Sequence, residues 1–223
     1  MEPTRAPRVK ICCIRSIAEA RMAIEAGASA LGLVSAMPSG PGVIGEEQIA
    51  EIAASVPPPI ATFLLTSKQD VDSVIQQQRR CRTNCVQLCD CITSGLLREL
   101  KSALPGISII QVIHVTGRES VEEAVAVASS VDAILLDSGN PSLAVKELGG
   151  TGRQHDWSLS KEIRERVSVP IFLAGGLKPE NVGEAIAAVQ PFGLDLCSGV
   201  RTEGKLDRSK LASFFAAVKN ATA

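Results

Sequence analysis

The sequence has almost no excess of either charge and lacks long apolar runs. Its 223 residues carry 23 Lys and Arg against 24 Asp and Glu, and no block of like charges occurs. This balance argues against binding nucleic acid or an anionic membrane through bulk charge. No apolar run reaches about 18 residues, so no transmembrane helix is expected.

We also expect no export signal, and this sets the expected state of the cysteines. The first residues, MEPTRAPR, are polar and lack the apolar core of a signal peptide, so we expect a cytoplasmic protein. Seven cysteines are an odd number for a disulfide framework, and the cytoplasm keeps thiols reduced. We therefore expect free thiols.

Short β-branched runs alternate with longer amphipathic segments. The expected strands are residues 9–14, 30–35, 60–66, 85–89, 108–115, 133–138, 170–176 and 193–199. The expected helices are residues 16–27, 45–56, 67–78, 93–104, 118–130, 158–167, 179–189 and 207–220. Strict alternation predicts parallel pairing, with each helix as the crossover to the next strand.

The eight strand-helix units predict an α/β fold, a single (β/α)8 TIM barrel over residues 1–223. Residues 1–8 are expected to form a flexible N-terminal extension. An open doubly wound sheet is the alternative, but no GxGxxG follows the first strand. The one long loop, residues 138–156, follows the sixth strand, and loops of this length tend to be functional.

Active sites of such barrels lie at the carboxyl ends of the strands, and glycines cluster after the last three strands. GGTG (149–152), AGG (174–176) and CSG (197–199) could bring backbone N–H groups to a phosphate, although each could also be a simple turn. Because three such segments share one side of the barrel, we favour a phosphate site.

Two side chains at strand ends could transfer protons. Asp137 ends the apolar strand AILLD, where burial would raise its pKa and suit it as a general acid, although it could instead cap the loop. Cys12 ends the first strand and could act as a base, although buried cysteine often serves only as a small hydrophobe. Alternation along a strand allows only one of Cys12 and Cys13 to face the barrel mouth.

The remaining cysteines and histidines leave a metal site open as a lesser alternative. Cys85 and Cys89 would share one strand face about 13 Å apart, too far for one zinc. The other members of this run are Cys81 and Cys91. A site built from Cys12, Cys89, Cys197 and His114 is conceivable, but we expect no metal, and His114 could equally be structural.

Taken in order, these motifs resemble the phosphoribosylanthranilate isomerase family of tryptophan biosynthesis. VKICC is similar to the family's opening VKICG. LLDS, then GGTG, then HDW follow the order of its sixth strand and loop, and AGGLKPENV and DLCSGV followed by GKLD match its closing motifs. The resemblance spans residues 9–215.

The resemblance implies an Amadori rearrangement of an aminoaldose phosphate, with no metal or organic cofactor. It places the base on Cys12 and the acid on Asp137. The phosphate would bind the backbone at Gly150, Thr151, Gly152, Gly175, Gly176, Ser198 and Gly199. The expected partner is a small phosphorylated sugar, with no nucleic acid and no membrane, and the protein is expected to be a monomer or homodimer.

The sequence departs from the family pattern where the anthranilate half of the substrate should bind. Cys13 replaces a glycine, and SAMPSGPGVI (35–44) lacks the arginine that would hold the anthranilate carboxylate. The family's QLHG is QLCD (87–90), and its SGVE ends in Arg201. An unpaired carboxylate in a dry pocket would cost several kcal/mol. We therefore keep Arg15, Cys89, His114 and Arg201 as possible substrate contacts.

Three functions are compatible with the sequence. The first is phosphoribosylanthranilate isomerase with a relocated carboxylate clamp. The second is a divergent member acting on another phosphorylated sugar adduct. The third is a non-catalytic barrel that binds a phosphometabolite or a metal, which retention of both Cys12 and Asp137 disfavours.

Overall fold

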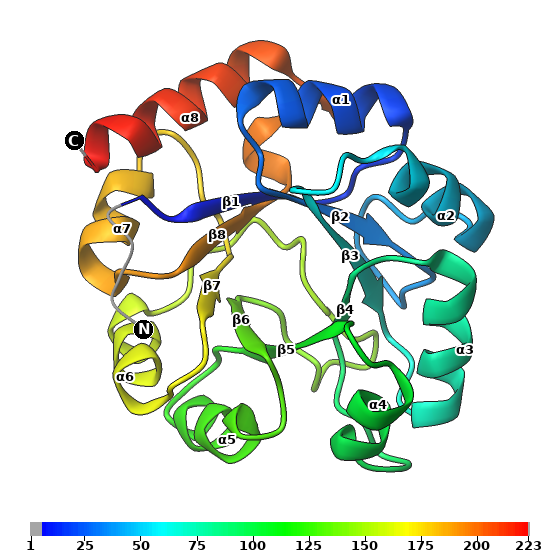
Figure 1. Cartoon of the computed structure of the whole chain (residues 1–223). Coiled ribbons are helices and arrows are strands. Elements are labelled where there is room, and N and C mark those ends of the chain that lie inside the picture. The colour runs from blue at the N-terminus through cyan, green and yellow to red at the C-terminus, as the bar shows by residue number, and fades with distance from the viewer. Residues whose placement is uncertain (1–5, 223) are drawn as a thin grey trace.

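The alternation of strand and helix signals closes into a barrel. The computed structural model describes residues 6–222 and shows a ring of parallel strands covered by helices (Figure 1). In this described part, eight strands pair in chain order and β8 pairs with β1, which confirms the (β/α)8 prediction. The strands are β1 (Arg8–Ile11), β2 (Ala30–Val34), β3 (Ala61–Thr66), β4 (Cys85–Leu88), β5 (Ser108–His114), β6 (Ala133–Asp137), β7 (Ile171–Leu173) and β8 (Gly193–Leu196).

The helices form the outer layer of the barrel. They are α1 (Ile17–Ala26), α2 (Glu46–Ser55), α3 (Val71–Cys81), α4 (Leu97–Ala103), α5 (Glu119–Ala128), α6 (Trp157–Arg166), α7 (Val182–Val189) and α8 (Arg208–Ala221). The capping signals of α1 act as the sequence predicts. Ser16 Oγ accepts from the Glu19 N–H at 3.1 Å, and Gly27 ends the helix at a φ of 112°. No helix in residues 6–222 is both long and apolar enough to span a bilayer.

Period-two alternation divides the strand side chains between two apolar clusters. In β6, Ile134 and Leu136 point outward and pack in the layer beneath the helices. Ala133 and Leu135 point inward and pack inside the barrel, so the same alternation directs Asp137 toward the interior. Asp137, the last residue of β6, therefore points inward at the carboxyl end of the barrel.

Several predicted strands end earlier than the sequence suggested. β1 ends at Ile11, β7 at Leu173 and β8 at Leu196, because the chain then turns into loops rather than continuing the ladder. A short 3-10 turn η1 (Ser198–Val200) and a hairpin of β9 (Arg201–Thr202) and β10 (Lys205–Leu206) follow β8, and the sequence patterns did not predict them.

Arg8 belongs to the barrel rather than to the predicted N-terminal extension. Arg8 is the first residue of β1, its N–H donates to the Phe192 carbonyl at 3.0 Å, and it is in register with Gly193. Residues 1–5 lie outside the described part of the chain. The proposed extension over residues 1–8 therefore cannot include Arg8.

Candidate active site

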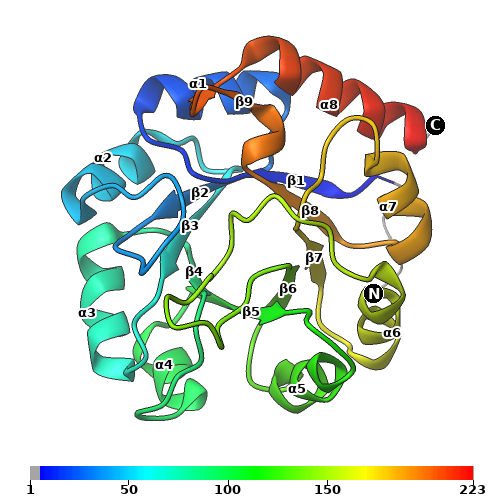
Figure 2. The same cartoon turned by 180° about the vertical axis from the view of Figure 1, so that it is seen from behind.

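A pocket opens at the carboxyl ends of the strands, where the fold class predicts an active site. The empty space between its lining residues is about 710 Å³, which includes solvent at the open mouth. The loop after β6 crosses the barrel opening (Figure 2) and supplies the segment Leu148–Gly152 to the lining. Ser39 Oγ, on the loop after β2, donates to the Lys146 carbonyl at 2.7 Å and ties these two loops together.

Asp137 lies inside this pocket with its carboxyl group almost entirely buried. The Ser138 N–H donates to its Oδ1 at 2.7 Å, which by itself would favour the charged form. Burial outweighs that hydrogen bond, and the neighbouring Asp195 carboxylate adds to it, so the pKa of Asp137 is raised. A carboxyl group in this setting holds its proton at a higher pH than usual and can act as an acid.

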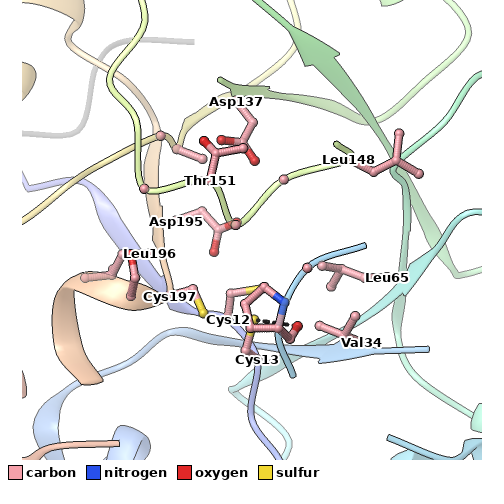
Figure 3. Close-up of a pocket in the computed structure, with 18 of the residues that line it drawn as sticks. Cys12, Cys13, Val34, Leu65, Asp137, Leu148, Thr151, Asp195, Leu196 and Cys197 are labelled. Carbon is pink, nitrogen blue, oxygen red and sulfur yellow. Dashed lines mark hydrogen bonds between the residues drawn. The ribbon is translucent and has the colours of Figure 1, made fainter. Parts of the chain in front are cut away.

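Cys12 lies across the pocket from Asp137, close to the buried ammonium group of Lys10. A Cβ atom placed on Gly32 would stand 2.8 Å from Cys12 Sγ and 3.1 Å from Lys10 Nζ, so only glycine leaves room for this pair. Figure 3 shows Cys12 below Asp195, with Asp137 on the far side. The two candidate proton-transfer groups therefore share one cavity.

Cys13 also lines the pocket, which corrects the expectation that only one of the two cysteines could face it. Alternation does not apply because β1 ends at Ile11, and Cys13 adopts a left-handed φ of 61°. Such a backbone costs a residue with a Cβ atom roughly 1–3 kcal/mol and is the conformation that glycine adopts freely. The family's glycine at this position therefore has a conformational reason.

Lys10 and Asp195 are site residues that sequence reasoning missed. Lys10 Nζ lies 2.9 Å from Asp195 Oδ2 in the barrel interior, and Asp195 lines the pocket. The Asp195 Oδ1 atom is buried and has no hydrogen-bond partner among the described residues. The sequence did hold a signal that could have revealed them. Each is a charged residue at an inward position between apolar neighbours, Lys10 in VKI and Asp195 in LDL.

The glycine-rich loops after β6, β7 and β8 meet at one end of the pocket, as the sequence suggested. Six of the seven predicted phosphate residues line it: Gly150, Thr151, Gly152, Gly175, Gly176 and Ser198. Gly176 packs against the Gly152 carbonyl so closely that a Cβ atom would stand 2.8 Å from it, and Gly176 has a φ of 65°. Gly199 is not in the lining but packs against the Leu177 carbonyl.

The four possible substrate contacts occupy different places. Cys89 lines the pocket, whereas His114 does not and donates from Nε2 to the Cys89 carbonyl at 3.1 Å. Arg15 is exposed and donates to the Gly204 carbonyl at 2.9 Å. Arg201 is buried and lies outside the pocket lining.

Arg201 instead supports the loop that follows β1. Its guanidinium donates to the Cys13 carbonyl at 2.6 Å and to the Cys12 carbonyl at 3.2 Å, and it pairs with Glu19 at 3.1 Å. Burial works against the charge of Glu19, but the hydrogen bonds and charge of Arg201, together with the N–H groups of Arg15 and Leu206, outweigh it and lower the Glu19 pKa. Arg201 therefore orients both cysteine-bearing residues from behind.

The described pocket lining contains no lysine or arginine side chain. Neither Arg15 nor Arg201 reaches it, so neither stands in for the family's carboxylate-binding arginine in this structure. The metal alternative gains no geometric support, since residues 6–222 bring together no group of three His, Cys, Asp or Glu side chains able to hold an ion.

The closed parallel barrel, with its pocket at the carboxyl ends of the strands, places the chain in the class of (β/α)8-barrel proteins. Residues 9–217 match the family model described as N-(5'phosphoribosyl)anthranilate (PRA) isomerase. The chain belongs to the phosphoribosylanthranilate isomerase family.

Relatives agree with this assignment across nearly the whole chain. N-(5'-phosphoribosyl)anthranilate isomerase 2 of Methanosarcina mazei is 37% identical, with 96% of this chain and 94% of the relative covered. The Thermotoga maritima phosphoribosyl anthranilate isomerase structure has a TM-score of 0.80 at 30% identity, covering 96% and 99% of the two chains.

A further solved structure holds a ligand. It is a phosphoribosyl anthranilate isomerase in complex with reduced 1-(o-carboxyphenylamino)-1-deoxyribulose 5-phosphate, with a TM-score of 0.77 at 28% identity and coverage of 96% and 99%.

Proposed function

We propose that this chain converts N-(5'-phosphoribosyl)anthranilate to its aminoketose isomer by an Amadori rearrangement. The main support for this function is the match to the isomerase family over residues 9–217, combined with a buried acid and a thiol in one pocket. The relatives are phosphoribosylanthranilate isomerases, and we infer that this chain takes the same kind of phosphorylated substrate. The expected cytoplasmic location and the choice between monomer and homodimer remain predictions.

Asp137 is the proposed general acid. Opening the ribose ring requires a proton on the ring oxygen as the C1–oxygen bond breaks, with the substrate nitrogen sharing the positive charge. Because its raised pKa keeps the Asp137 carboxyl protonated to a higher pH, it can supply that proton. Its position in the pocket places the acid where an enclosed sugar ring can reach it.

Cys12 is the proposed general base. After ring opening, the Schiff base carries an acidic hydrogen on C2, and its removal gives an enolamine that tautomerises to the ketone. The Cys12 thiolate would take that proton, with the ammonium group of Lys10 beside it. The reaction moves protons within the substrate and needs no external oxidant or reductant.

The glycine-lined end is the proposed phosphate anchor. Backbone N–H groups of Gly150–Gly152, Gly175–Gly176 and Ser198 can approach an anion because few side chains intervene. Holding the phosphate fixes the ribose between Asp137 and Cys12, so that remote binding energy positions the reacting carbon.

The absence of an arginine after the second strand is the observation that favoured a different sugar adduct, and the described pocket lining also holds no basic side chain. The comparisons do not support that alternative, since the relatives and the ligand-bound neighbour are phosphoribosylanthranilate isomerases.

Complementation and direct assay together test the proposal. The gene should restore growth without tryptophan to a strain lacking the isomerase, and the purified protein should convert N-(5'-phosphoribosyl)anthranilate in a chromatographic assay. The Asp137→Asn variant should do neither. A folded protein that fails both tests would refute the proposed substrate, and binding of the substrate without turnover would indicate a non-catalytic barrel.

A further inference from the structure

We propose that Cys13 and Cys197 form an oxidative modification site, a dithiol that a hydroperoxide converts to a disulfide across the mouth of the barrel. Cys13 stands where the family's VKICG motif carries glycine, and Cys197 lies in the DLCSGV segment at the end of the last strand. Neither thiol has a role in the proposed isomerisation. The isomerisation does not require this disulfide.

Strand pairing brings the two cysteines together. Cys13 follows β1 and Cys197 follows β8, and these neighbouring strands are in register at Ile11 and Leu196. The Cys12 N–H donates to the Leu196 carbonyl at 2.8 Å, so the ladder continues to the last residue before Cys197. By this register Cys12 follows opposite Cys197 and Cys13 is one residue further along, so all three cysteines lie where two neighbouring strands about 4.8 Å apart end.

The left-handed backbone of Cys13 directs its side chain into the same space. Both Cys13 and Cys197 line the pocket, and Figure 3 shows them clustered with Cys12 at one wall. The Cys13 Sγ lies 3.5 Å from the Pro41 carbonyl and also contacts the thiols of Cys12 and Cys197. All the cysteines are free thiols in this structure.

The two thiols differ in pKa in the way expected if Cys197 reacts with the peroxide and Cys13 then closes the disulfide. The contact with the Cys13 thiol, followed by the Arg201 guanidinium, lowers the pKa of Cys197, which is half-buried and open to the pocket. Contacts with the Cys12 and Cys197 thiols, together with burial, raise the pKa of Cys13. Cys197 is thus the better nucleophile, and Cys13 is the thiol held beside it.

The chemistry balances with a hydroperoxide as the only added reactant. The Cys197 thiolate attacks a peroxide oxygen, the O–O bond breaks, and an S–OH group forms as the second oxygen leaves as water or an alcohol. The Cys13 sulfur then attacks the Cys197 sulfur, and the S–O bond breaks to release water with the Cys13 proton. Two thiols lose two electrons, and the peroxide gains them.

The disulfide would change the active site next to Cys12 and Ser198. Bringing the sulfurs to about 2.05 Å pulls Cys13 away from the Pro41 carbonyl and ties the loop after β1 to the loop after β8. We expect the linked protein to lose at least tenfold in kcat/KM and to recover when dithiothreitol reduces the bond.

Peptide mapping of the full-length protein tests the site without relying on activity. After hydrogen peroxide treatment and alkylation, trypsin should yield residues 11–15 linked to residues 167–201. Because residues 11–15 contain both Cys12 and Cys13, Cys12→Ser should retain the link, whereas Cys13→Gly and Cys197→Ser should lose it. Cys13→Gly suits the left-handed backbone, Cys197→Ser is nearly isosteric, and exposed Cys91→Ser serves as the matched control.

The peptide maps distinguish a Cys13–Cys197 disulfide from a bond made by Cys12. A link that persists in Cys13→Gly, or disappears in Cys12→Ser, would assign the bond to Cys12 and overturn the proposal. Absence of any link in the wild type after all accessible thiols have reacted would do so as well. If the substrate proves to be different, the peptide map still decides the disulfide, because it measures the bond itself.

Discussion

Lys10 and Asp195 are register partners on β1 and β8 and form an ion pair 2.9 Å long inside the barrel. Lys10 is fully buried, and its ammonium group also lies 5.2 Å from the centre of the Phe63 ring. Burial alone would lower the pKa of Lys10, but the Asp195 carboxylate, together with the Cys12 and Cys89 thiols, outweighs it and raises that pKa. The pair thus places the Asp195 side chain beside Asp137 and the Lys10 ammonium group beside Cys12.

Removing the lysine should destabilise the fold strongly. Lys10→Met leaves the Asp195 charge buried without its partner, which typically costs about 3–5 kcal/mol in the free energy of unfolding. Urea denaturation measures this. Lys101→Met is the control, because its pair with Asp132 is about one-third exposed and should contribute no more than about 1 kcal/mol. Similar losses in the two variants would contradict the buried role of Lys10.

The acid and base assignments predict large losses of turnover. Cys12→Ser and Asp137→Asn should each lower kcat by roughly 10²–10⁴-fold, because each removes a proton-transfer group that contacts the reacting sugar. Steady-state kinetics measures the change, and circular dichroism confirms folding. Cys91→Ser changes an exposed cysteine outside the pocket and should keep wild-type kinetics. A near-normal rate in either pocket variant would remove its assigned role.

The neighbouring carboxylate predicts a shift in the pH profile. Asp137 must be protonated to act, so activity should fall as pH rises through its raised pKa. Asp195→Asn removes a negative charge that helps to raise that pKa, so this falling limb should move to lower pH. The measurement is kcat against pH for both proteins. An unchanged limb would show that Asp137 does not set it.

The glycine-lined anion site predicts different results for two glycines with similar backbones. Gly176 and Gly204 have φ values of 65° and 74°, so alanine strains both to a similar degree. A Cβ on Gly176 would also push the Gly152 carbonyl away, whereas nothing lies within 4 Å of one on Gly204. We expect Gly176→Ala to raise KM at least tenfold and Gly204→Ala to change it less than twofold. Equal effects would argue against the anion site.

His155 predicts a pH dependence of stability. Burial lowers its pKa from 6.5 to about 4, against the opposing charge of Asp156. The unfolded chain therefore binds more protons between these values, and the free energy of unfolding should fall as pH drops from about 6.5 to about 4, by at most about 1.4 kcal/mol per pH unit. His155→Gln should flatten this difference in urea titrations at several pH values. Parallel curves for the two proteins would exclude His155 as the cause.

Local sequence patterns determined much of this molecule. Period-two alternation directs Asp137 to the interior of β6, and a serine and a glycine begin and end α1. The succession of strands and helices and the three glycine-rich loops follow from the same short-range signals, because each depends only on residues close together in the chain. These patterns were sufficient to predict the barrel and the end of the pocket that is rich in glycine.

Only the tertiary structure decided which distant side chains meet. Lys10 pairs with Asp195, and Cys13 meets Cys197, because β8 closes against β1 at the two ends of the chain. Arg201 turns from the pocket to Glu19 and the loop carbonyls, since a buried guanidinium needs more acceptors than the Gly204 carbonyl of its own hairpin supplies. Alternation also misjudged Cys13, because it holds only while a strand continues, and β1 ends at Ile11.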